Sequence, residues 1–334
     1  MKFGLIGAGR IGRIHAQNLC RFLTDVHLKW VTDVFEASAR DCAEELSIPE
    51  WGTDYTKMLN DPEIQAVVVC SSTDTHTQII RAAADAGKHV FCEKPIDVDL
   101  SQIDQALQSV QQAQTILQIG FNRRFDVNFD RIHKAVASGE IGTPHQIHII
   151  SRDPGPPPIE YIRKSGGIFL DMMIHDFDMA RFLTGHEIIE VYAVGSVQVD
   201  PEIGKAGDFD TATVLLKFDN GVTGVIENCR KAVYGYDQRV EVFGSKGCIS
   251  ADNRVPDQVT VRGSRNIHTT LPLHFFIERY QESYIEEMRR FAEAIRLQLP
   301  SPVSGEESRI PVVTAMAAQR SAMENRPVKL NEIA

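Results

Sequence analysis

Residues 3–12 read Phe-Gly-Leu-Ile-Gly-Ala-Gly-Arg-Ile-Gly, which joins a short apolar strand to the pattern Gly-x-Gly-x-x-Gly. The pattern alone is common, but here it follows a predicted strand and opens a predicted helix over 11–23 with apolar residues at helical spacing. In this context the first glycine permits a tight turn, the second lets a ligand approach the backbone, and the third lets helix and strand pack closely. The stretch therefore predicts the first strand–turn–helix unit of a parallel sheet.

The rest of the first 120 residues repeats this alternation. Residues 66–70 (Ala-Val-Val-Val-Cys) form a continuous apolar run, which is typical of a strand buried on both faces. Strands alternating with helices form right-handed β-α-β units, so residues 1–120 are predicted to form an α/β domain with a doubly wound parallel sheet. Further strands are predicted over 27–32, 89–92 and 116–119, and helices over 37–46, 77–86 and 100–114.

Beyond Gly120 the chain changes to runs of strands. Asp219-Asn220-Gly221, between two of them, is a hairpin signal. Runs of strands with few helices predict, for residues 121–334, an α+β domain with a largely antiparallel open sheet. Its strands are predicted over 143–151, 190–199, 211–218, 222–229, 239–243 and 259–261, and its long helices over 167–183, 278–297 and 306–324.

Composition excludes several classes of protein. The 334 residues are 43% hydrophobic and 24% charged, as in an ordinary two-domain globular protein. No apolar stretch near the N-terminus approaches the ~18 residues of a membrane helix, and no secretory signal is recognisable. A net charge of −10 argues against nucleic acid as a partner. The six cysteines are scattered without a Cys-x-x-Cys pair, so we expect a reduced, cytoplasmic protein with no membrane partner.

The glycine-rich turn points to a dinucleotide. The helix that follows it offers free N–H groups and a positive dipole end to phosphates. Asp33 ends the second strand 21 residues after Gly12, near the spacing of the acid that binds ribose hydroxyls, although an unrelated aspartate would fit the same pattern. A carboxylate there repels a 2′-phosphate, so NAD is predicted over NADP. The predicted contacts in this region are Gly7, Gly9, Arg10, Ile11, Gly12 and Asp33.

Two further stretches carry candidate chemistry. Lys94, within Glu93-Lys94-Pro95, follows strand 89–92 at the sheet edge where α/β sheets bind ligands, although a solvated Glu-Lys pair is the alternative. On a helix over 167–183, Asp171, His175 and Asp178 would share one face of an otherwise apolar segment. A polar stripe there is costly unless it forms a satisfied network, faces solvent or lines a site, and in a dinucleotide protein we favour a site.

The remaining histidines and cysteines are weaker candidates. His133, His145 and His148 have no cysteine or carboxylate that completes a zinc set, so we expect surface histidines and no metal. Cys92 is interpreted as a small apolar strand residue.

Four stretches, 7–12, 93–95, 120–126 and 166–183, resemble the glucose–fructose oxidoreductase / inositol dehydrogenase family, and the resemblance covers nearly the whole chain. Residues 151–161 with 166–172 are similar to its inositol 2-dehydrogenase branch. The resemblance implies a catalytic set of Lys94, Asp171 and His175 and a cis Lys94–Pro95 peptide. It implies a polyol site lined by these three and by Asp153, Asp178 and either Tyr234 or Tyr236.

The resemblance also bears on the cofactor and on assembly. It implies that residues 122–125, which begin with Asn122, pass close to the nicotinamide, and that a cofactor loop contains Ser71, Ser72, Thr73 and His76. Glu93 and Lys94 are also predicted to bind the cofactor. In that loop the usual Thr-Pro pattern is replaced by Ser72-Thr73-Asp74. Members commonly form homotetramers or dimers through the outer face of the second sheet.

These observations predict an NAD-dependent dehydrogenase of a cyclic polyol, with myo-inositol oxidised to 2-keto-myo-inositol (scyllo-inosose). Since histidine changes its protonation nearest neutral pH, His175 is assigned as general base, Asp171 as its orienting partner and Lys94 as a donor to the reacting oxygen. Other substrates stay open: scyllo-inositol, glucose or levoglucosan. A non-catalytic dinucleotide-sensing regulator would share the fold, but it has no need of all three side chains.

Overall fold

A computed structural model describes residues 1–333, which form two compact units. The first contains Met1–Phe125 and Glu282–Ile310, and the second contains Asp126–Gln281 and the chain from Pro311 onward. Residues 282–310 thus pack with the first unit, although sequence analysis grouped them with the second half. The domain boundary at residue 120 stays a prediction about how the chain divides.

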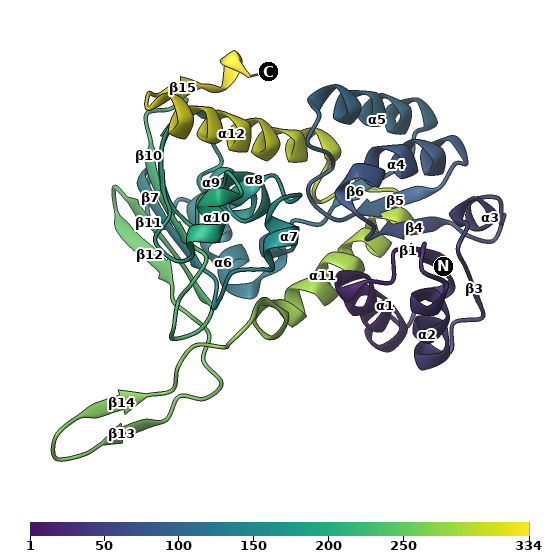
Figure 1. Ribbon diagram of the computed structural model, residues 1–334, viewed down its shortest axis with the longest axis horizontal. Helices are drawn as coiled ribbons and strands as arrows, with labels where there is room; N and C mark the ends of the chain where they lie inside the picture. Colours follow the sequence, from purple (N-terminus) through teal and green to yellow (C-terminus); the bar gives the residue numbers. More distant parts are fainter. Residues whose placement is uncertain (334) are drawn as a thin grey trace. The chain divides into compact units, whose positions relative to one another are not determined.

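The first unit is built on a six-stranded parallel sheet of order β3-β2-β1-β4-β5-β6 (Figure 1). The predicted doubly wound parallel sheet is confirmed, and strand order reverses between β1 and β4, where α/β sheets bind ligands. The strands are β1 (Lys2–Ile6), β2 (His27–Thr32), β3 (Glu50–Gly52), β4 (Ala66–Val69), β5 (His89–Cys92) and β6 (Leu117–Ile119). The helices are α1 (Arg10–Phe22), α2 (Glu36–Leu46), α3 (Tyr55–Leu59), α4 (His76–Asp85) and α5 (Leu100–Ala113), with 3₁₀ turns η1 (Thr73–Thr75) and η2 (Asn122–Phe125).

The core of this unit depends on a helix from the far end of the sequence. Helix α11 (Phe276–Leu297) has non-helical backbone at Tyr280, and its residues from 282 onward belong to the first unit. Phe291 of α11 packs edge-on against Phe3 of β1, with ring centroids 5.7 Å apart. Both rings are fully buried, so α11 covers apolar residues of the parallel sheet.

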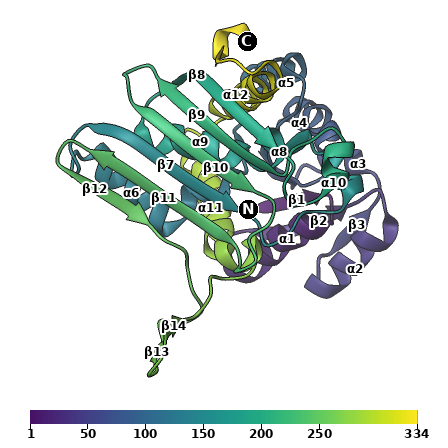
Figure 2. The ribbon, with the colours of Figure 1, turned by 60° about the vertical axis from the view of Figure 1, so that its left-hand side comes forward.

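The second unit has a seven-stranded sheet of order β12-β11-β7-β10-β9-β8-β15, with helices α6 and α9 on one face (Figure 2). Every neighbouring pair is antiparallel except β7 with β10, so the predicted largely antiparallel sheet is confirmed. The predicted hairpin joins β9 to β10, and Gly221 in its turn has φ +89°. The strands are β7 (Pro144–Arg152), β8 (Ile188–Ser196), β9 (Thr211–Phe218), β10 (Thr223–Cys229), β11 (Asp237–Gly244), β12 (Gly247–Ala251) and β15 (Val328–Lys329). The helices are α6 (Val127–Ala137), α7 (Ile159–Ile162), α8 (Gly167–Asp171), α9 (Ile174–Thr184) and α10 (Pro201–Lys205), with a 3₁₀ turn η3 (Leu330–Glu332). Helix α12 (Gly305–Glu324) begins in the first unit and belongs to the second from Pro311 onward.

The prediction of a single helix over 167–183 is wrong. Helix α8 ends at Asp171 and α9 begins at Ile174, with the Met173 N–H bonded to the Ile168 carbonyl five residues back. The regular spacing of four residues is therefore interrupted between the two helices. As a result, Asp171 lies at the end of one helix and His175 in the first turn of the next, rather than on one continuous face.

A ribbon of two short strands, β13 (Thr260–Arg262) and β14 (Ile267–Thr269), extends from the second unit away from its sheet (Figure 1). Within residues 1–333, no helix combines the length and the apolar character that crossing a membrane requires.

Candidate functional site

Each of the three glycines in the turn after β1 has a different structural role. Gly7 has φ +97°, and a Cβ there would lie 2.6 Å from the Cys70 carbonyl carbon. A Cβ at Gly12 would lie 1.9 Å from the Gly7 carbonyl oxygen, so only glycine fits. At Gly9, by contrast, a Cβ would meet no protein atom within 4 Å. The backbone at Gly9 is therefore open to a ligand, while Gly7 and Gly12 close the turn.

Helix α1 begins at this opening. Its N-cap residue Gly9 makes no side-chain hydrogen bond, and its first turn carries no acidic residue. The N–H groups of the first turn, which starts with Arg10 and Ile11, lie at the positive end of the helix dipole and suit a phosphate.

Asp33, directly after β2, is held against the same turn. Its Oδ2 accepts a hydrogen bond from the Ala8 N–H at 2.7 Å, and its Oδ1 accepts one from the Phe35 N–H at 2.9 Å. These two bonds fix the carboxylate beside the glycines, where it fits a ribose of a dinucleotide. The turn, the helix and Asp33 together fit NAD.

His76 ties together the loops that follow β4 and β5. Its Nδ1 lies 2.9 Å from the Pro95 carbonyl oxygen and its Nε2 lies 3.0 Å from the Ser71 carbonyl oxygen. The ring is only 1% exposed. The Ser71 hydroxyl bonds Thr75, while Ser72 is exposed and Thr73 opens η1. The His76 ring therefore fixes the shape of the loop and is not exposed to a ligand.

Lys94 and Asn122 follow the neighbouring strands β5 and β6. The Lys94–Pro95 peptide is cis, as the resemblance implies. The Lys94 N–H donates to Glu93 Oε2 at 3.3 Å, and Glu93 Oε1 lies 2.7 Å from His15 Nε2. Asn122 is 2% exposed at the start of η2. The predicted cofactor residues of the first unit therefore all follow the carboxyl ends of its strands.

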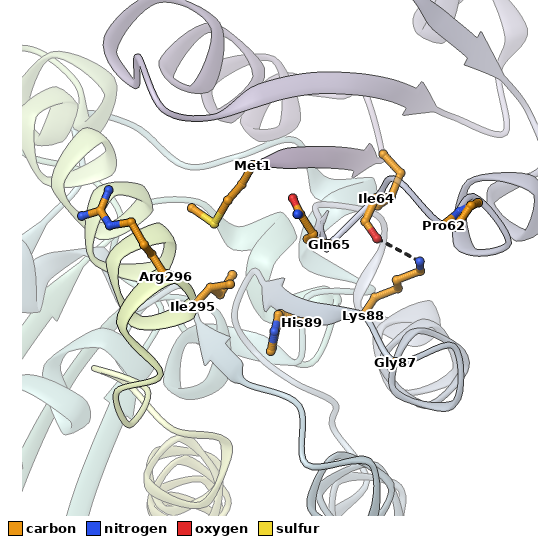
Figure 3. A pocket seen from close by; sticks show the side chains of 9 residues that line it. All are labelled: Met1, Pro62, Ile64, Gln65, Gly87, Lys88, His89, Ile295 and Arg296. Atoms are coloured by element: carbon orange, nitrogen blue, oxygen red, sulfur yellow. Dashed lines mark hydrogen bonds between the residues drawn. The ribbon is translucent and has the colours of Figure 1, made fainter.

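A hollow of about 470 Å³ lies at the opposite edge of this sheet (Figure 3). Its lining includes Met1, Gln65 and His89, which stand at the amino ends of β1, β4 and β5. The Lys88 ammonium at its rim donates to the Ile64 and Asp61 carbonyls. Because ligands of α/β sheets bind at the carboxyl ends of the strands, this hollow is not the dinucleotide site.

In the second unit, Asp171 is fixed by two side chains. Its Oδ1 accepts from the Tyr161 hydroxyl at 2.8 Å, and its Oδ2 accepts from Arg230 Nη1 at 3.2 Å. Arg230 is 1% exposed and also donates to Asp208, whose other oxygen accepts from the Ile168 N–H of α8. Sequence reasoning missed Arg230 and Tyr161, because an arginine after a strand and a tyrosine after a proline-rich loop are ordinary patterns.

Asp176, the residue after His175, anchors α9 to the sheet. It is fully buried, and its carboxylate accepts from the Ser151 hydroxyl at 2.6 Å and the Asn228 amide at 2.7 Å. This anchor fixes the backbone that carries the half-buried His175. Asp178, two residues further on, is 1% exposed. Sequence reasoning also missed Asp176, which the predicted helical stripe left out.

Asp153 follows β7 and lies beside the end of β10. Its N–H donates to the Cys229 carbonyl at 3.0 Å, and its own carbonyl accepts from the Ala232 N–H at 2.6 Å. These backbone bonds bring the Asp153 loop next to Arg230, which directly follows Cys229.

The two candidate tyrosines lie in different surroundings. The Tyr234 hydroxyl donates to Asp237 and accepts from Arg152. Arg152 faces away from α9, because successive strand residues alternate and Ser151 bonds to α9. The structure therefore does not bring Tyr234 to Asp171. Tyr236 is 6% exposed and packs edge-on against Tyr280, whose hydroxyl reaches Gln238, a residue that also bonds Ser151.

Comparison with known proteins covers both units. Residues 1–121 match the oxidoreductase family with an NAD-binding Rossmann fold, and residues 129–250 match the GFO/IDH/MocA C-terminal domain. The chain is 50% identical over 333 residues to a myo-inositol 2-dehydrogenase of Thermotoga maritima, covering 100% of this chain and 99% of that protein. It is 43% identical over 331 residues to an inositol 2-dehydrogenase of Rhizobium meliloti, covering 99% of each.

A solved structure agrees with these relatives. The crystal structure of scyllo-inositol dehydrogenase from Lactobacillus casei, with bound NAD(H) and scyllo-inositol, matches with a TM-score of 0.93 at 31% identity, covering 99% of each chain. The family predicted from the motifs is confirmed, NAD is the cofactor, and this chain is an oxidoreductase of the GFO/IDH/MocA family.

Proposed function

We propose that this protein is an NAD-dependent inositol 2-dehydrogenase that oxidises myo-inositol to 2-keto-myo-inositol (scyllo-inosose). The observation that carries the proposal is the 50% identity to a myo-inositol 2-dehydrogenase over 100% of this chain and 99% of that protein. The open backbone at Gly9 and the Asp33 carboxylate provide for the cofactor, and the Asp171 and His175 region provides polar side chains for a polyol.

Cofactor binding is assigned to the first 120 residues and Asn122. The N-terminus of α1 holds the pyrophosphate, and Asp33 accepts hydrogen bonds from the adenosine ribose. The loop of Ser71, Ser72 and Thr73, held by His76, lies along the same sheet edge. Glu93, Lys94 and Asn122 complete the cofactor side. When bound, NAD supplies the electrophilic carbon that takes the hydride.

Residues 121–334 supply the rest of the polyol site in this proposal. His175 accepts the hydroxyl proton as general base, and Asp171 orients it and stabilises its protonated form. Lys94 donates a hydrogen bond to the reacting oxygen and stabilises the negative charge that develops there. Asp153, Asp178 and Tyr236 contact the other hydroxyls. We prefer Tyr236 to Tyr234, since the Tyr234 partner Arg152 faces away from α9, whereas Tyr236 packs on Tyr280 beside the Gln238–Ser151 bond that leads to α9.

A panel of polyols with NAD tests the substrate. Purified protein is mixed with NAD and, separately, with myo-inositol, scyllo-inositol, glucose and levoglucosan, and NADH is followed by its absorbance. The highest kcat/KM is expected with myo-inositol. A higher value with scyllo-inositol would assign the chain the activity of the Lactobacillus casei structure, and binding of NADH without turnover of any of the four would favour a dinucleotide sensor.

We also propose a homo-oligomer, a dimer or tetramer, built on the outer face of the seven-stranded sheet. Leu215 in β9, Phe243 in β11 and Val194 in β8 are 50%, 48% and 53% exposed. Apolar side chains gathered on one open sheet face are typical of an interface. Light scattering is expected to give a mass of at least two chains for wild type and a lower mass for Leu215→Glu; an unchanged mass would exclude this face.

The location that we propose is the cytoplasm, where six cysteines that form no disulfide among residues 1–333 would stay reduced. Cell fractionation, with a cytoplasmic marker enzyme as the control, tests it.

A further inference from the structure

Three polar side chains meet inside the first unit, and one of them belongs to Glu93, the residue before Lys94. They are His15 from α1, Glu93 from the end of β5 and Glu287 from α11, and their nearest ligand atoms all lie within 4.8 Å of one another. We call these three residues the Glu93 cluster. His15 and Glu287 are fully buried, and the Glu93 side chain is 12% exposed. Polar groups buried in a hydrophobic core cost stability unless hydrogen bonds satisfy them, so such a cluster is a candidate for a functional role.

The centre of the cluster is a short hydrogen bond. His15 Nε2 lies 2.7 Å from Glu93 Oε1, and because a carboxylate only accepts, the imidazole donates. The other oxygen of Glu93, Oε2, accepts the backbone N–H of Lys94. Glu93 thus bonds His15 with one oxygen and the backbone of the proposed catalytic lysine with the other.

The surroundings of the cluster leave its members little freedom. The His15 ring packs edge-on against Phe91 of β5, at 5.1 Å between centroids, and against Tyr284 of α11, at 5.7 Å. At Gly120 a Cβ would lie 3.0 Å from Glu93 Oε2, so the carboxylate also rests against the backbone after β6. The Glu93 carboxylate is therefore surrounded by α1, the end of β5, the backbone after β6 and α11.

Glu287 is the member that holds a proton. Complete burial and the nearby charge of Glu93 raise the pKa of Glu287 well above its usual range. Neither of its carboxyl oxygens has a hydrogen-bond partner among residues 1–333, and Oε1 lies 3.9 Å from His15 Nε2. A neutral Glu287 leaves Glu93 as the one negative charge of the cluster, which the His15 and Lys94 N–H groups then satisfy.

We infer that His15 is a positioning residue for the reaction: through Glu93 it fixes the backbone of Lys94 and ties that residue to the helix that begins at the glycine-rich turn. Glu287 supports this arrangement as a neutral acid. The inference rests on the proposed function, since it assigns Lys94 to the reacting oxygen. It concerns His15 and Glu287, which are fully buried and belong to none of the cofactor or polyol contacts proposed above.

The test compares two replacements of His15. His15→Leu removes the donor to Glu93, so Lys94 loses its fixed backbone, and kcat at saturating NAD and substrate is expected to fall about tenfold or more. His15→Gln restores an N–H near the position of Nε2, and kcat is expected to recover to within about threefold of wild type. The Kd of NADH, measured by fluorescence, is expected to change less than threefold in both.

Asn18→Leu is the matched control. Asn18 is also buried on α1, one turn further along, and its Nδ2 has no partner among residues 1–333. It should leave kcat within twofold of wild type. Equal kcat values for His15→Leu and Asn18→Leu would overturn the inference while leaving the inositol activity of wild type intact.

Glu287→Gln separates a neutral acid from a metal ligand. Glutamine has the shape of a protonated glutamate, so stability and kcat are expected to stay near wild type. If the cluster instead holds a metal, elemental analysis of wild type would find a stoichiometric divalent ion that Glu287→Gln loses, and the inference would be wrong.

A wild type inactive on all four substrates would refute the proposed function but not this inference. Crystal structures of wild type and His15→Leu with NADH would then decide, with displacement of the Lys94 backbone expected in the variant. An unmoved Lys94 would refute the positioning role.

Discussion

The glycine-rich edge of the parallel sheet and the α8–α9 region of the second unit are stabilised in contrasting ways. At the sheet edge, the main chain holds the structure together. Gly7 and Gly12 fit where a Cβ would overlap the main chain, and Asp33 bonds main-chain N–H groups. In the α8–α9 region, charged side chains from separate segments hold the structure together, and Arg230 pairs with both Asp171 and Asp208. The first arrangement depends on the main chain and the second on charged side chains, so the two regions should respond differently to mutation.

The largest effect is expected where both regions are proposed to act on one substrate. Lys94→Ala and His175→Ala should each lower kcat about 10²- to 10⁴-fold, because general acid–base and electrostatic stabilisation are worth factors of this size. In His175→Ala the Kd of NADH should change little, since the proposed cofactor residues are untouched. Lys57→Ala, at an exposed position on α3, is the control. A His175→Ala variant with near-normal kcat would make Lys94 the leading candidate for the base.

Arg230→Met tests the buried charges of the second region. It leaves Asp171 and Asp208 without their shared guanidinium, and breaking a buried ion pair typically costs about 3–5 kcal/mol. We expect a loss of this order in the free energy of urea unfolding, together with a lower kcat. Arg131→Met, which removes an exposed pair with Glu140 in the same unit, should cost under about 1 kcal/mol. Equal losses in the two variants would show that Arg230 does not stabilise the α8–α9 region.

Asp33→Ala tests the glycine-rich edge of the parallel sheet. Wild type is expected to prefer NAD over NADP in kcat/KM at least ~10-fold, which is about 1.4 kcal/mol. The alanine variant should narrow this gap, mainly through a higher KM for NAD, because both a ribose acceptor and a repelling charge are lost. Equal use of both cofactors by wild type would contradict the assignment of Asp33.

The same contrast decides what could be predicted from sequence. The strands 27–32, 89–92 and 211–218 have the observed bounds, because alternation and β-branched runs report burial directly. The break at Met172–Met173 was missed, since both residues are apolar and continue the helical pattern. Arg230, Asp176 and the Glu93 cluster were missed because their partners lie 22 or more residues away in the chain, where residue spacing carries no signal.

The smallest effect is expected for the stability of the protein in acid, to which Asp237 on the outer face of the seven-stranded sheet contributes. Hydrogen bonds from Arg239, Tyr234 and Asn253 outweigh the burial of Asp237 and lower the pKa of its carboxyl to about 2. A lowered pKa in the folded state means that ionised Asp237 stabilises the fold above pH ~4, and that this contribution is lost as pH falls from 4 towards 2. Asp237→Asn should therefore flatten the decline of unfolding stability in this window by about 1 kcal/mol. Urea unfolding at pH 2.5, 4 and 7 measures it, with Asp85→Asn, at an exposed position on α4, as the control. The bonds to the Asp237 carboxylate come from side chains rather than from the backbone. If the free energy of unfolding fell with pH equally in Asp237→Asn and wild type, the charge of Asp237 would contribute nothing to stability.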